Sequence, residues 1–237
     1  MKQAQKDCHY RGLMAGLVLA LVFLVVLAIG LGRFYLSPAR VTQILFSKIF
    51  PIEQIWPAQE ESVIFTLRLP RIIAAILVGM SLSLSGAAYQ GVFKNPLVAP
   101  DMLGVSAGAC VGASAAILFS ANEGVIQILA FLGGISAVAL ASAIPRLVKN
   151  QSMMTLVLAG VIISGLMNSI LGLLKYLADP DTQLASITHW QLGSLSSAVW
   201  RDIVYVGPPI FLAAVVLVAA RWKINVLSLG ENEARSL

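Results

Sequence analysis

Residues 68–112 read RLPRIIAAILVGMSLSLSGAAYQGVFKNPLVAPDMLGVSAGACVG, and they combine a charged start, a long uncharged run and two further prolines. Arg68 and Arg71 flank Pro70, and proline is favoured at the first position of a helix. We therefore expect a helix to begin at Pro70, with both arginines at the positive end of its dipole. A cation costs about 0.3 to 1 kcal/mol at such a position. Two charges placed so unfavourably point to a function for these arginines.

The whole chain is strongly apolar, since 58% of its 237 residues are hydrophobic and 11% are charged. This composition is typical of a membrane protein rather than a soluble globule. A helix needs about 20 apolar residues to cross the hydrocarbon core. Six intervals between charges meet or approach that length: 11–33, 71–94, 101–123, 123–146, 149–175 and 202–221. They predict an all-α bundle with six transmembrane helices. We interpret the first as an anchor, because its uncharged core is longer than that of a signal peptide.

The basic residues predict the orientation of the spans. If the spans alternate, nine of the 16 lysines and arginines lie on the side of the N-terminus: Lys2, Lys6, Arg11, Lys94, Arg146, Lys149, Arg221, Lys223 and Arg235. The positive-inside rule then places the N-terminus in the cytoplasm. The chain is expected to be a multi-pass protein of the inner (plasma) membrane. Arg68 and Arg71 fall on the outer side. There they either snorkel to lipid phosphates or dock an acidic partner.

Asp, Glu, Lys, Arg and His are absent from the interior of all six intervals. Carriers coupled to protons or ions usually need such groups at membrane depth. The sequence also has no HExxH motif and no phosphate-binding GxxxxGK[ST] loop. We therefore predict no catalytic residue, no metal site and no cofactor, and we expect the driving energy to enter through another protein.

Small residues recur at helical spacing in several spans. Gly104, Gly108 and Gly112 are four residues apart, so they share one helix face that lets a neighbouring backbone approach closely. Similar small or polar faces follow in two other spans: Gly79, Ser83 and Gly86, then Gly160, Ser164 and Asn168. Asn168 either lines a polar path or bonds to a neighbouring helix.

Two segments outside the spans have distinct patterns. Residues 94–101 contain two prolines, which exclude a continuous helix and indicate a re-entrant or gating element, or a plain turn. Residues 221–237 form a polar stretch with apolar residues on one face, divided at Gly230. Such a surface helix pair docks into a groove of a partner protein or lies on lipid.

Several motifs in order resemble the FecCD-type permease family of ABC importers, the membrane subunits that import ferric siderophores, haem and cobalamin. They are RLPR at 68–71, residues 86–90, Asn95-Pro96-Leu97 with Pro100, Leu103-Gly104, residues 106–109, and Leu-Gly-Glu at 229–231. The resemblance implies a type II importer permease fold of about ten spans. Residues 1–237 would form a single, incomplete permease domain with about six of these spans, truncated within a cytoplasmic coupling segment at 222–237.

The resemblance also implies roles at both membrane faces. Arg68 and Arg71 would dock a periplasmic or lipid-anchored substrate-binding protein through its glutamates. Asn95 and Leu97 would form a cytoplasmic gate. A second gate would lie at Met153, Met154 and Thr155, at the start of the fifth span.

Further implied roles concern the pore and the energy-coupling partner. The fifth span would line the pore at the interface of a permease homodimer, through Ser164 and Asn168. The coupling segment would insert into one of two ATP-binding cassette subunits through Leu227, Leu229, Gly230, Glu231, Ala234 and Leu237.

The expected function is import of an iron-siderophore, haem, cobalamin or similar metal chelate across the inner membrane. The expected partners are a second permease, two ATPase subunits, a substrate-binding protein and membrane lipid, with no nucleic acid. Two alternatives stay open. A secondary transporter would need ionisable residues in further spans, and a membrane scaffold or assembly protein would need no pore.

Overall fold

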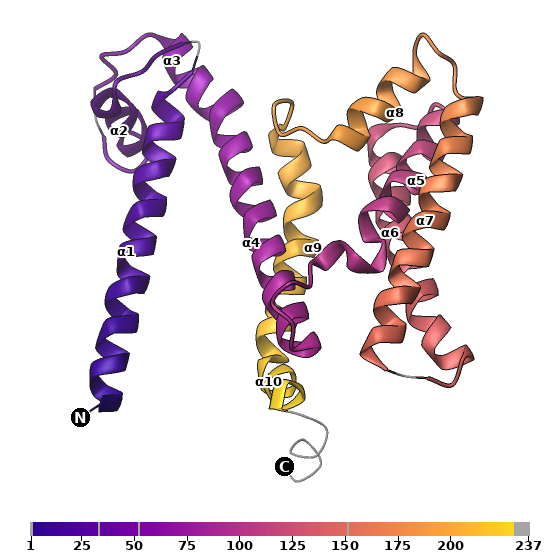
Figure 1. Ribbon diagram of the computed structural model, residues 1–237. Coiled ribbons are helices and arrows are strands. Elements are labelled where there is room, and N and C mark those ends of the chain that lie inside the picture. The colour runs from indigo at the N-terminus through magenta and orange to yellow at the C-terminus, as the bar shows by residue number, and fades with distance from the viewer. Residues whose placement is uncertain (1, 33, 52, 151, 230–237) are drawn as a thin grey trace. The chain divides into compact units, whose positions relative to one another are not determined.

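The computed structural model describes residues 2–32, 34–51, 53–150 and 152–229, and all regular structure in these residues is helical (Figure 1). The chain divides into two compact units. The first comprises Met1–Val78 and Leu195–Pro209, and the second comprises Gly79–Ser194 and Ile210–Leu237. The helices are α1 (Lys2–Gly30), α2 (Pro38–Phe46), α3 (Ala58–Ser62), α4 (Leu69–Phe93), α5 (Val105–Leu118), α6 (Glu123–Leu147), α7 (Met153–Leu177), α8 (Gln183–Leu192), α9 (Trp200–Ala219) and α10 (Arg221–Leu229). A π-helical turn, Val63–Arg68, precedes α4, and a 3₁₀ helix, Pro100–Leu103, precedes α5.

Five helical runs in the described residues are long and apolar enough to cross a membrane. They are Tyr10–Gly30, Ala58–Phe93, Glu123–Leu147, Met153–Leu177 and Trp200–Ala219. The prediction of an all-helical, multi-pass protein is therefore confirmed. The third predicted span is the exception, because only 14 of its residues form a helix, α5. That helix is about 21 Å long, which is less than the hydrocarbon thickness of about 30 Å.

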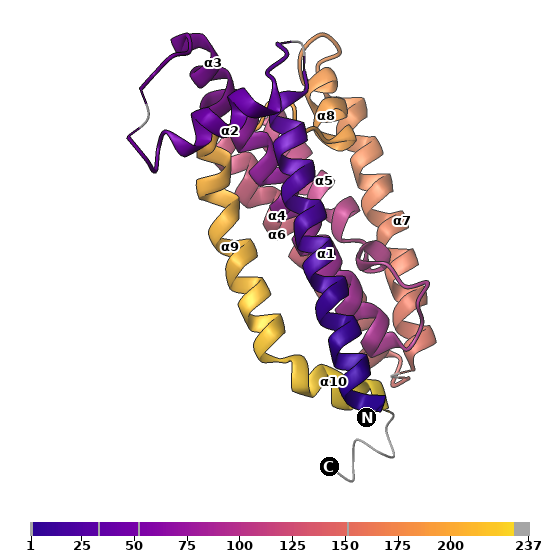
Figure 2. The ribbon, with the colours of Figure 1, turned by 90° about the vertical axis from the view of Figure 1, so that its left-hand side faces the viewer.

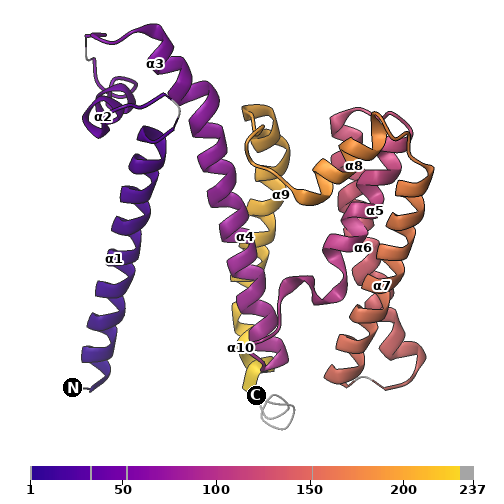
Figure 3. The ribbon, with the colours of Figure 1, turned by 45° about the horizontal axis from the view of Figure 1, so that its top comes forward.

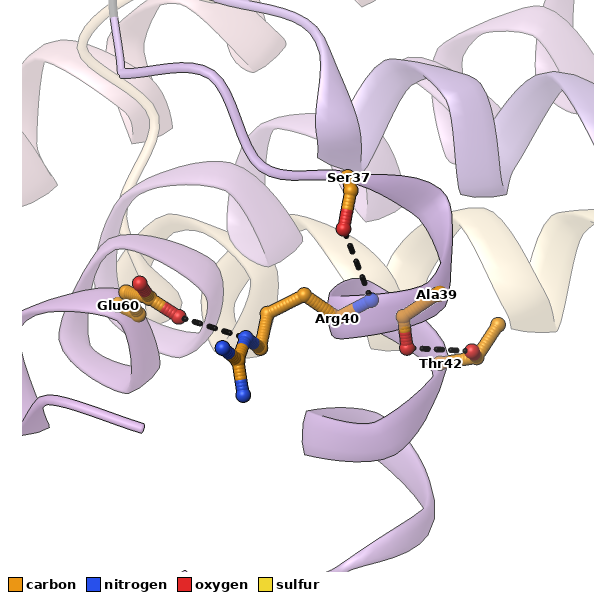
Figure 4. A network of polar contacts seen from close by, with 5 residues as sticks. All are labelled: Ser37, Ala39, Arg40, Thr42 and Glu60. Atoms are coloured by element: carbon orange, nitrogen blue, oxygen red, sulfur yellow. Dashed lines mark hydrogen bonds and ion pairs between the residues drawn. The ribbon is translucent and has the colours of Figure 1, made fainter. Parts of the chain in front are cut away.

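The first unit has its core where α1 ends, beneath the short helices α2 and α3 (Figure 2). Val41 and Ile44 are buried on one face of α2 and pack with Ile29 and Ile64. Ser37 caps α2 by accepting the backbone N–H of Arg40 at 3.3 Å. The same arginine pairs with Glu60 of α3, with 3.6 Å between Nε and Oε2 (Figure 4). Apolar burial and one ion pair thus attach α2 to the helical run that follows.

The predicted helix start at Pro70 is wrong. Helix α3, the π-helical turn and α4 form one helical run, Ala58–Phe93, so Arg68 and Arg71 lie inside it. Acidic Glu60 and Glu61 occupy the first turn, where the helix dipole favours negative charge. Proline is tolerated within this run because the turn before it is π-helical, with the backbone N–H of Leu69 bonded to the carbonyl of Ile64.

The second unit contains a bundle of α5, α6 and α7, with α8 across one end (Figure 3). The predicted glycine face on α5 is confirmed. A Cβ added at Gly108 would lie 2.4 Å from the carbonyl oxygen of Gly133, and one at Gly112 would lie 2.0 Å from that of Leu129. Only glycine permits α5 and α6 to pack this closely. Gly79, by contrast, has open space beside it.

Helix α8 is held to the bundle by apolar and polar contacts. Ile187 is buried in a cluster with Leu171 and Ala178. The side-chain amide of Gln183 donates to the carbonyl of Leu118 at 3.1 Å. Because that carbonyl lies at the last residue of α5, the bond satisfies one of the acceptors that a helix end leaves unpaired.

Candidate functional site

Arg68, predicted to be a docking residue, makes two hydrogen bonds within the first unit. Its guanidinium donates to the backbone carbonyls of Ile29 and Phe34. Ile29 is in the last turn of α1, whose final carbonyls have no partner within the helix. The side chain is half-buried. Arg68 therefore caps the C-terminal end of α1 in this structure.

Arg71 is in a different environment, three residues further along the same helical run. Its side chain is exposed, and it makes no hydrogen bond or ion pair with the part of the chain that the structure describes. Two other cations of this unit are paired. Arg40 contacts Glu60, and Lys48 lies 2.5 Å from Glu61, measured from Nζ to Oε1. Of the two predicted docking residues, Arg71 is the one available to a partner.

The segment after α4 contains the predicted gate residues Asn95 and Leu97. The side-chain oxygen of Asn95 accepts the backbone N–H of Leu97 at 2.9 Å, which fixes a tight turn. The Leu97 side chain is 85% exposed, whereas the adjacent Val98 is buried. The described residues of this unit therefore leave the apolar side chain of Leu97 largely uncovered.

Beyond this turn, the 3₁₀ helix packs against α7 through backbone contacts. A Cβ added at Gly160 would lie 2.0 Å from the carbonyl oxygen of Met102. Gly104, with φ of +78°, lies against Ser164, where an added Cβ would be 2.9 Å from Oγ. Leu103 is buried between these contacts and packs with Ile163. The 3₁₀ helix and α7 thus meet with no side chain separating their backbones at Gly160.

The position of these contacts along α7 explains why α5 is short. Gly160 and Ser164 lie about 10 and 16 Å from the first residue of α7, which is about 37 Å long. Helix α5 therefore starts beside the middle of α7 rather than beside its end. The carboxylate of Asp101 accepts the backbone N–H of Ser106 at 3.0 Å and satisfies one donor at the start of α5. Of the two open interpretations of residues 94–101, this geometry favours a re-entrant element.

The residues of the second predicted gate form the first turn of α7. Ser152 caps the helix by accepting the backbone N–H of Thr155 at 3.2 Å, and the two hydroxyl oxygens are 2.8 Å apart. The hydroxyl of Thr155 is thus engaged in capping. Met153 and Met154 are exposed, at 43% and 70%. The apolar surface at this end of α7 comes from the methionines.

Further along α7, the two predicted pore residues differ in exposure. Ser164 is half-buried against Gly104, as described above, whereas Asn168 is exposed on the same unit. The polar path predicted for this helix therefore rests on Asn168, and its role in a pore stays a prediction.

The predicted coupling segment lies only partly within the described residues. Helix α10 contains Leu227 and Leu229, while Gly230, Glu231, Ala234 and Leu237 lie outside the described residues. Ile224 of α10 lies beside Gly91 of α4, where an added Cβ would be 3.9 Å from its Cγ2. The start of the coupling segment therefore contacts the end of α4, which leads directly into the gate segment at Asn95.

Two residues that matter for these arrangements were missed by sequence reasoning. Gly32 gives Arg68 access to α1, because a Cβ there would lie 2.8 Å from Nη2 of the guanidinium. Trp200 donates its indole N–H to the carbonyl of Phe65 at 2.8 Å. Neither residue belongs to a motif, and their partners are 36 and 135 positions away in the sequence. Only the fold brings them together.

Metal-binding groups are not assembled in the part of the chain with described side chains. No three His, Cys, Asp or Glu residues there are grouped to hold a metal ion. Cys110 is a free cysteine that packs against an apolar cluster of Leu171 in α7, Ala178, and Ile187 in α8. The described geometry consists of close helix contacts at glycines and of exposed apolar side chains at Leu97, Met153 and Met154.

The comparison with known proteins agrees with this architecture. The family model described as the FecCD transport family matches residues 20–237. The chain belongs to the FecCD transport family. Among FecCD relatives, a molybdate import system permease of Haemophilus influenzae is 37% identical, over 96% of this chain and 67% of that protein. An iron chelatin transport permease of Helicobacter pylori is 41% identical over 74% of this chain and 52% of its own length.

A third FecCD relative, the hemin transport permease of Yersinia pestis, is 33% identical over 72% of this chain and 52% of its own. The chain thus spans about half to two-thirds of the length of these relatives. A solved structure, described as a metal-chelate type ABC transporter in an inward-facing conformation, matches with a TM-score of 0.81 and 35% identity. That match covers 96% of this chain and 68% of the other. Membership of the FecCD family, predicted from the ordered motifs, is confirmed.

Proposed function

We propose that this chain acts in the permease subunit of an ABC importer that carries a metal chelate across the inner membrane. The observation that carries the proposal is the family match over residues 20–237, together with the likeness of the fold to a metal-chelate type transporter. The relatives named above are permeases of import or transport systems for molybdate, iron chelatin and hemin. ATP hydrolysis would take place on two separate cassette subunits, since the chain has no phosphate-binding loop.

The proposed orientation places the N-terminus and residues 94–101 in the cytoplasm, and Arg71 outside. The distribution of lysines and arginines supports it. A substrate-binding protein would dock on the outer face through acidic groups. Two permease copies would form the pore, with α7 of each at their interface and Asn168 facing the path.

The proposed gate consists of Leu97 with Asn95 on one side and Met153 and Met154 on the other. The exposure of these apolar side chains supports the proposal, since exposed apolar residues at a pore mouth can close it by excluding water. Movement would reach the gate from α10, which contacts α4 at Gly91. The remaining coupling residues, to Leu237, would extend this surface into the ATPase.

The proposed cargo is an iron chelate, haem, cobalamin or similar metal complex. The described membrane-length helices have few charges in their apolar windows, which suits passage of a bulky complex without tight binding. Molybdate is a second candidate, because the molybdate permease aligns over 96% of this chain, against 74% for the iron chelatin permease.

Uptake competition tests the cargo. Cells or vesicles that contain the complete system would be given labelled ferric siderophore, haemin, cobalamin or molybdate in turn, each with and without an excess of the same compound unlabelled. Saturable uptake of one metal chelate but not of molybdate is the expected result. Saturable uptake of molybdate alone would replace the first candidate with the second. Saturable uptake of none of the four would contradict both.

A further inference from the structure

The second unit has a strongly basic end, formed where α4 and α6 finish and where α10 begins (Figure 1). We propose that this end binds the head groups of anionic phospholipids. We call it the basic surface and define it by five cations and one tryptophan: Lys94, Arg146, Lys149, Arg221, Trp222 and Lys223. From the proposed function it takes only the orientation, which puts these head groups in the cytoplasmic leaflet.

The first argument is the charge of this end. Each of its five cations is exposed, and none makes an ion pair or a side-chain hydrogen bond with the described residues. The described carboxylates of the second unit lie elsewhere. Glu123, Asp179 and Asp181 are at the opposite end, and Asp101 is beside the middle of α7, where it accepts the backbone N–H of Ser106. The basic surface therefore needs its counter-charge from another molecule, and that molecule must be anionic.

The second argument is the position of Arg221, Trp222 and Lys223 along the chain. They follow α9, a membrane-length helix that ends at Ala219, after one intervening residue. Figure 2 shows α10 turning away from the line of α9. Trp222 is 72% exposed, and tryptophan is enriched where the membrane meets water. The two cations beside it therefore lie at the level of the lipid head groups.

The third argument is a contact that joins two parts of the basic surface. Ile224 of α10 lies against Gly91 of α4, where an added Cβ would be 3.9 Å from Cγ2 of the isoleucine. Lys223 precedes this isoleucine, and Lys94 is three residues beyond Gly91. Cations from two helices thus come to the same face of the unit. Phosphate groups at that face would meet charges from both.

The fourth argument is that lysine occupies two backbone positions that favour glycine. Lys94 and Lys149 follow the ends of α4 and α6 with φ of +50° and +55°. The N–H of Lys149 bonds to the carbonyl of Arg146 at 3.2 Å, and that of Asn150 bonds to Pro145 at 3.1 Å. This is the Schellman pattern, in which glycine is usual because a side chain is strained there.

Two explanations account for these lysines. A cation interacts favourably with the negative end of its own helix dipole, and a cation at a membrane surface interacts with anionic lipid. The first concerns the stability of the fold, whereas the second concerns lipid composition. The two can therefore be separated by experiment. Exposure of both side chains and their place beside Arg221 and Lys223 on one basic end favour the lipid.

The test uses Trp222 as the reporter of nearby lipid. The complete transporter, with its cassette subunits, is placed in nanodiscs that contain phosphatidylglycerol or phosphatidylcholine brominated near the head group. Bromine quenches tryptophan fluorescence at short range, and the difference between the wild type and Trp222→Phe isolates the signal of Trp222. Both leaflets hold the same lipid, so the result does not depend on orientation. We expect a preference for phosphatidylglycerol of about three- to tenfold at low salt, and of less than about twofold in 1 M salt.

Substitutions on α10 test the charges. Arg221→Gln combined with Lys223→Gln should reduce the preference to less than about twofold. The exchange Arg221→Lys with Lys223→Arg keeps both charges and should keep the preference. Lys175→Gln removes a cation at the opposite end of the unit and should also keep it. The Tm should change little in the first two variants, because these side chains are exposed.

Lys94→Gly and Lys149→Gly separate lipid binding from a structural role. Together they should reduce the preference by about half and raise Tm by about 1 to 4 °C, because glycine relieves the left-handed backbone. A lower Tm with an unchanged preference would mean that the lysines serve only their helix ends, and would contradict their part in the basic surface.

Three results would overturn the proposal as a whole. Equal quenching of Trp222 by the two lipids would show contact without recognition of charge. Quenching by neither would show that a protein subunit covers this end. A preference that survives the double glutamine variant, or high salt, would have another cause. If the glutamine variant does not fold, the charge-preserving exchange, the glycine variants and the salt series still decide.

Failure of the proposed function gives a different pattern. A transporter that prefers phosphatidylglycerol at Trp222 but shows no uptake driven by ATP would contradict the importer and leave the basic surface standing. Uptake driven by ATP without any such preference would contradict the basic surface and leave the importer standing.

Discussion

The indole N–H of Trp200 donates to the backbone carbonyl of Phe65 at 2.8 Å. This carbonyl needs an outside donor because of Pro70. In the π-helical turn, Leu69 bonds to Ile64, so the next backbone donor in the same pattern would be residue 70, which as proline has no N–H. Trp200 of α9 supplies the missing donor. A break in the helical hydrogen bonding at the RLPR motif is thus repaired by a residue 135 positions away.

Replacing Trp200 with phenylalanine should therefore destabilise the first unit. The change keeps most of the ring but removes the N–H, which leaves the Phe65 carbonyl without its donor and costs about 0.5 to 1.5 kcal/mol, because the bond is exposed. Thermal unfolding of the purified variant measures the loss. Trp222→Phe on α10 is the control, because that side chain is 72% exposed. Equal stability of the two variants would mean that Phe65 finds another donor.

Gly160 should not tolerate alanine. Its Cβ would lie 2.0 Å from the Met102 carbonyl, a backbone atom that cannot move without displacing the 3₁₀ helix. We expect Gly160→Ala to cost about 2 kcal/mol or more. Transport should also fall, because the change displaces the segment that we propose as a gate.

Gly165→Ala provides the matched control on the same helix. No described residue of this chain lies within 4 Å of its added Cβ. Alanine is also the better helix former by about 1 kcal/mol, so this variant should be neutral or slightly more stable. Transport and stability assays on both variants would show a clear difference. If Gly160→Ala behaves like Gly165→Ala, the contact between Met102 and α7 is looser than the structure has it.

The surroundings of Asp179, in the turn between α7 and α8, predict that the stability of the fold depends on pH. The side chain and backbone N–H of Thr182 and the backbone N–H of Asp181 donate to its carboxylate, and these bonds lower the pKa of Asp179 below the ordinary value of 3.8. A depressed folded-state pKa stabilises the fold above the unfolded-state pKa, and this stabilisation is lost as the pH falls through the folded-state value.

Thermal melts of the wild type and Asp179→Ala across acidic and neutral pH measure this contribution. We expect the variant to be less stable than the wild type at neutral pH, and the difference to shrink as the pH falls below about 4. A difference that stays constant over this range would assign the effect of the substitution to something other than the charge of Asp179.

Membrane-length helices could be predicted from the sequence because the length of an uncharged run reflects bilayer thickness directly. The glycine face at Gly108 and Gly112 could be predicted for the same kind of reason, since spacing of four residues defines a helix face. The sequence could not identify α6 as the helix that packs on this face, because a row of small residues does not indicate which helix it contacts. The family followed from ordered motifs that do not depend on exact helix boundaries.

Predictions from local sequence patterns were wrong where a residue distant in the sequence alters the local structure. Pro70 is a sound signal for a helix start, but the helix continues through it because a π-helical turn precedes it and Trp200 satisfies Phe65. The third predicted span is shorter than its uncharged interval because Gly160 contacts Met102 in the fold, a contact that the sequence does not reveal. The different surroundings of Arg68 and Arg71 likewise depend on where α1 ends.

Transport driven by ATP in a defined system measures the proposed function most directly. The complete permease and its cassette subunit would be reconstituted in vesicles. The substrate-binding protein and labelled ferric siderophore would be placed together on the same side of the membrane. Uptake should require ATP and should stop when the P-loop lysine of the cassette subunit is substituted. Uptake that continues with the inactive cassette and collapses when the proton gradient is dissipated would contradict the importer and identify a secondary transporter.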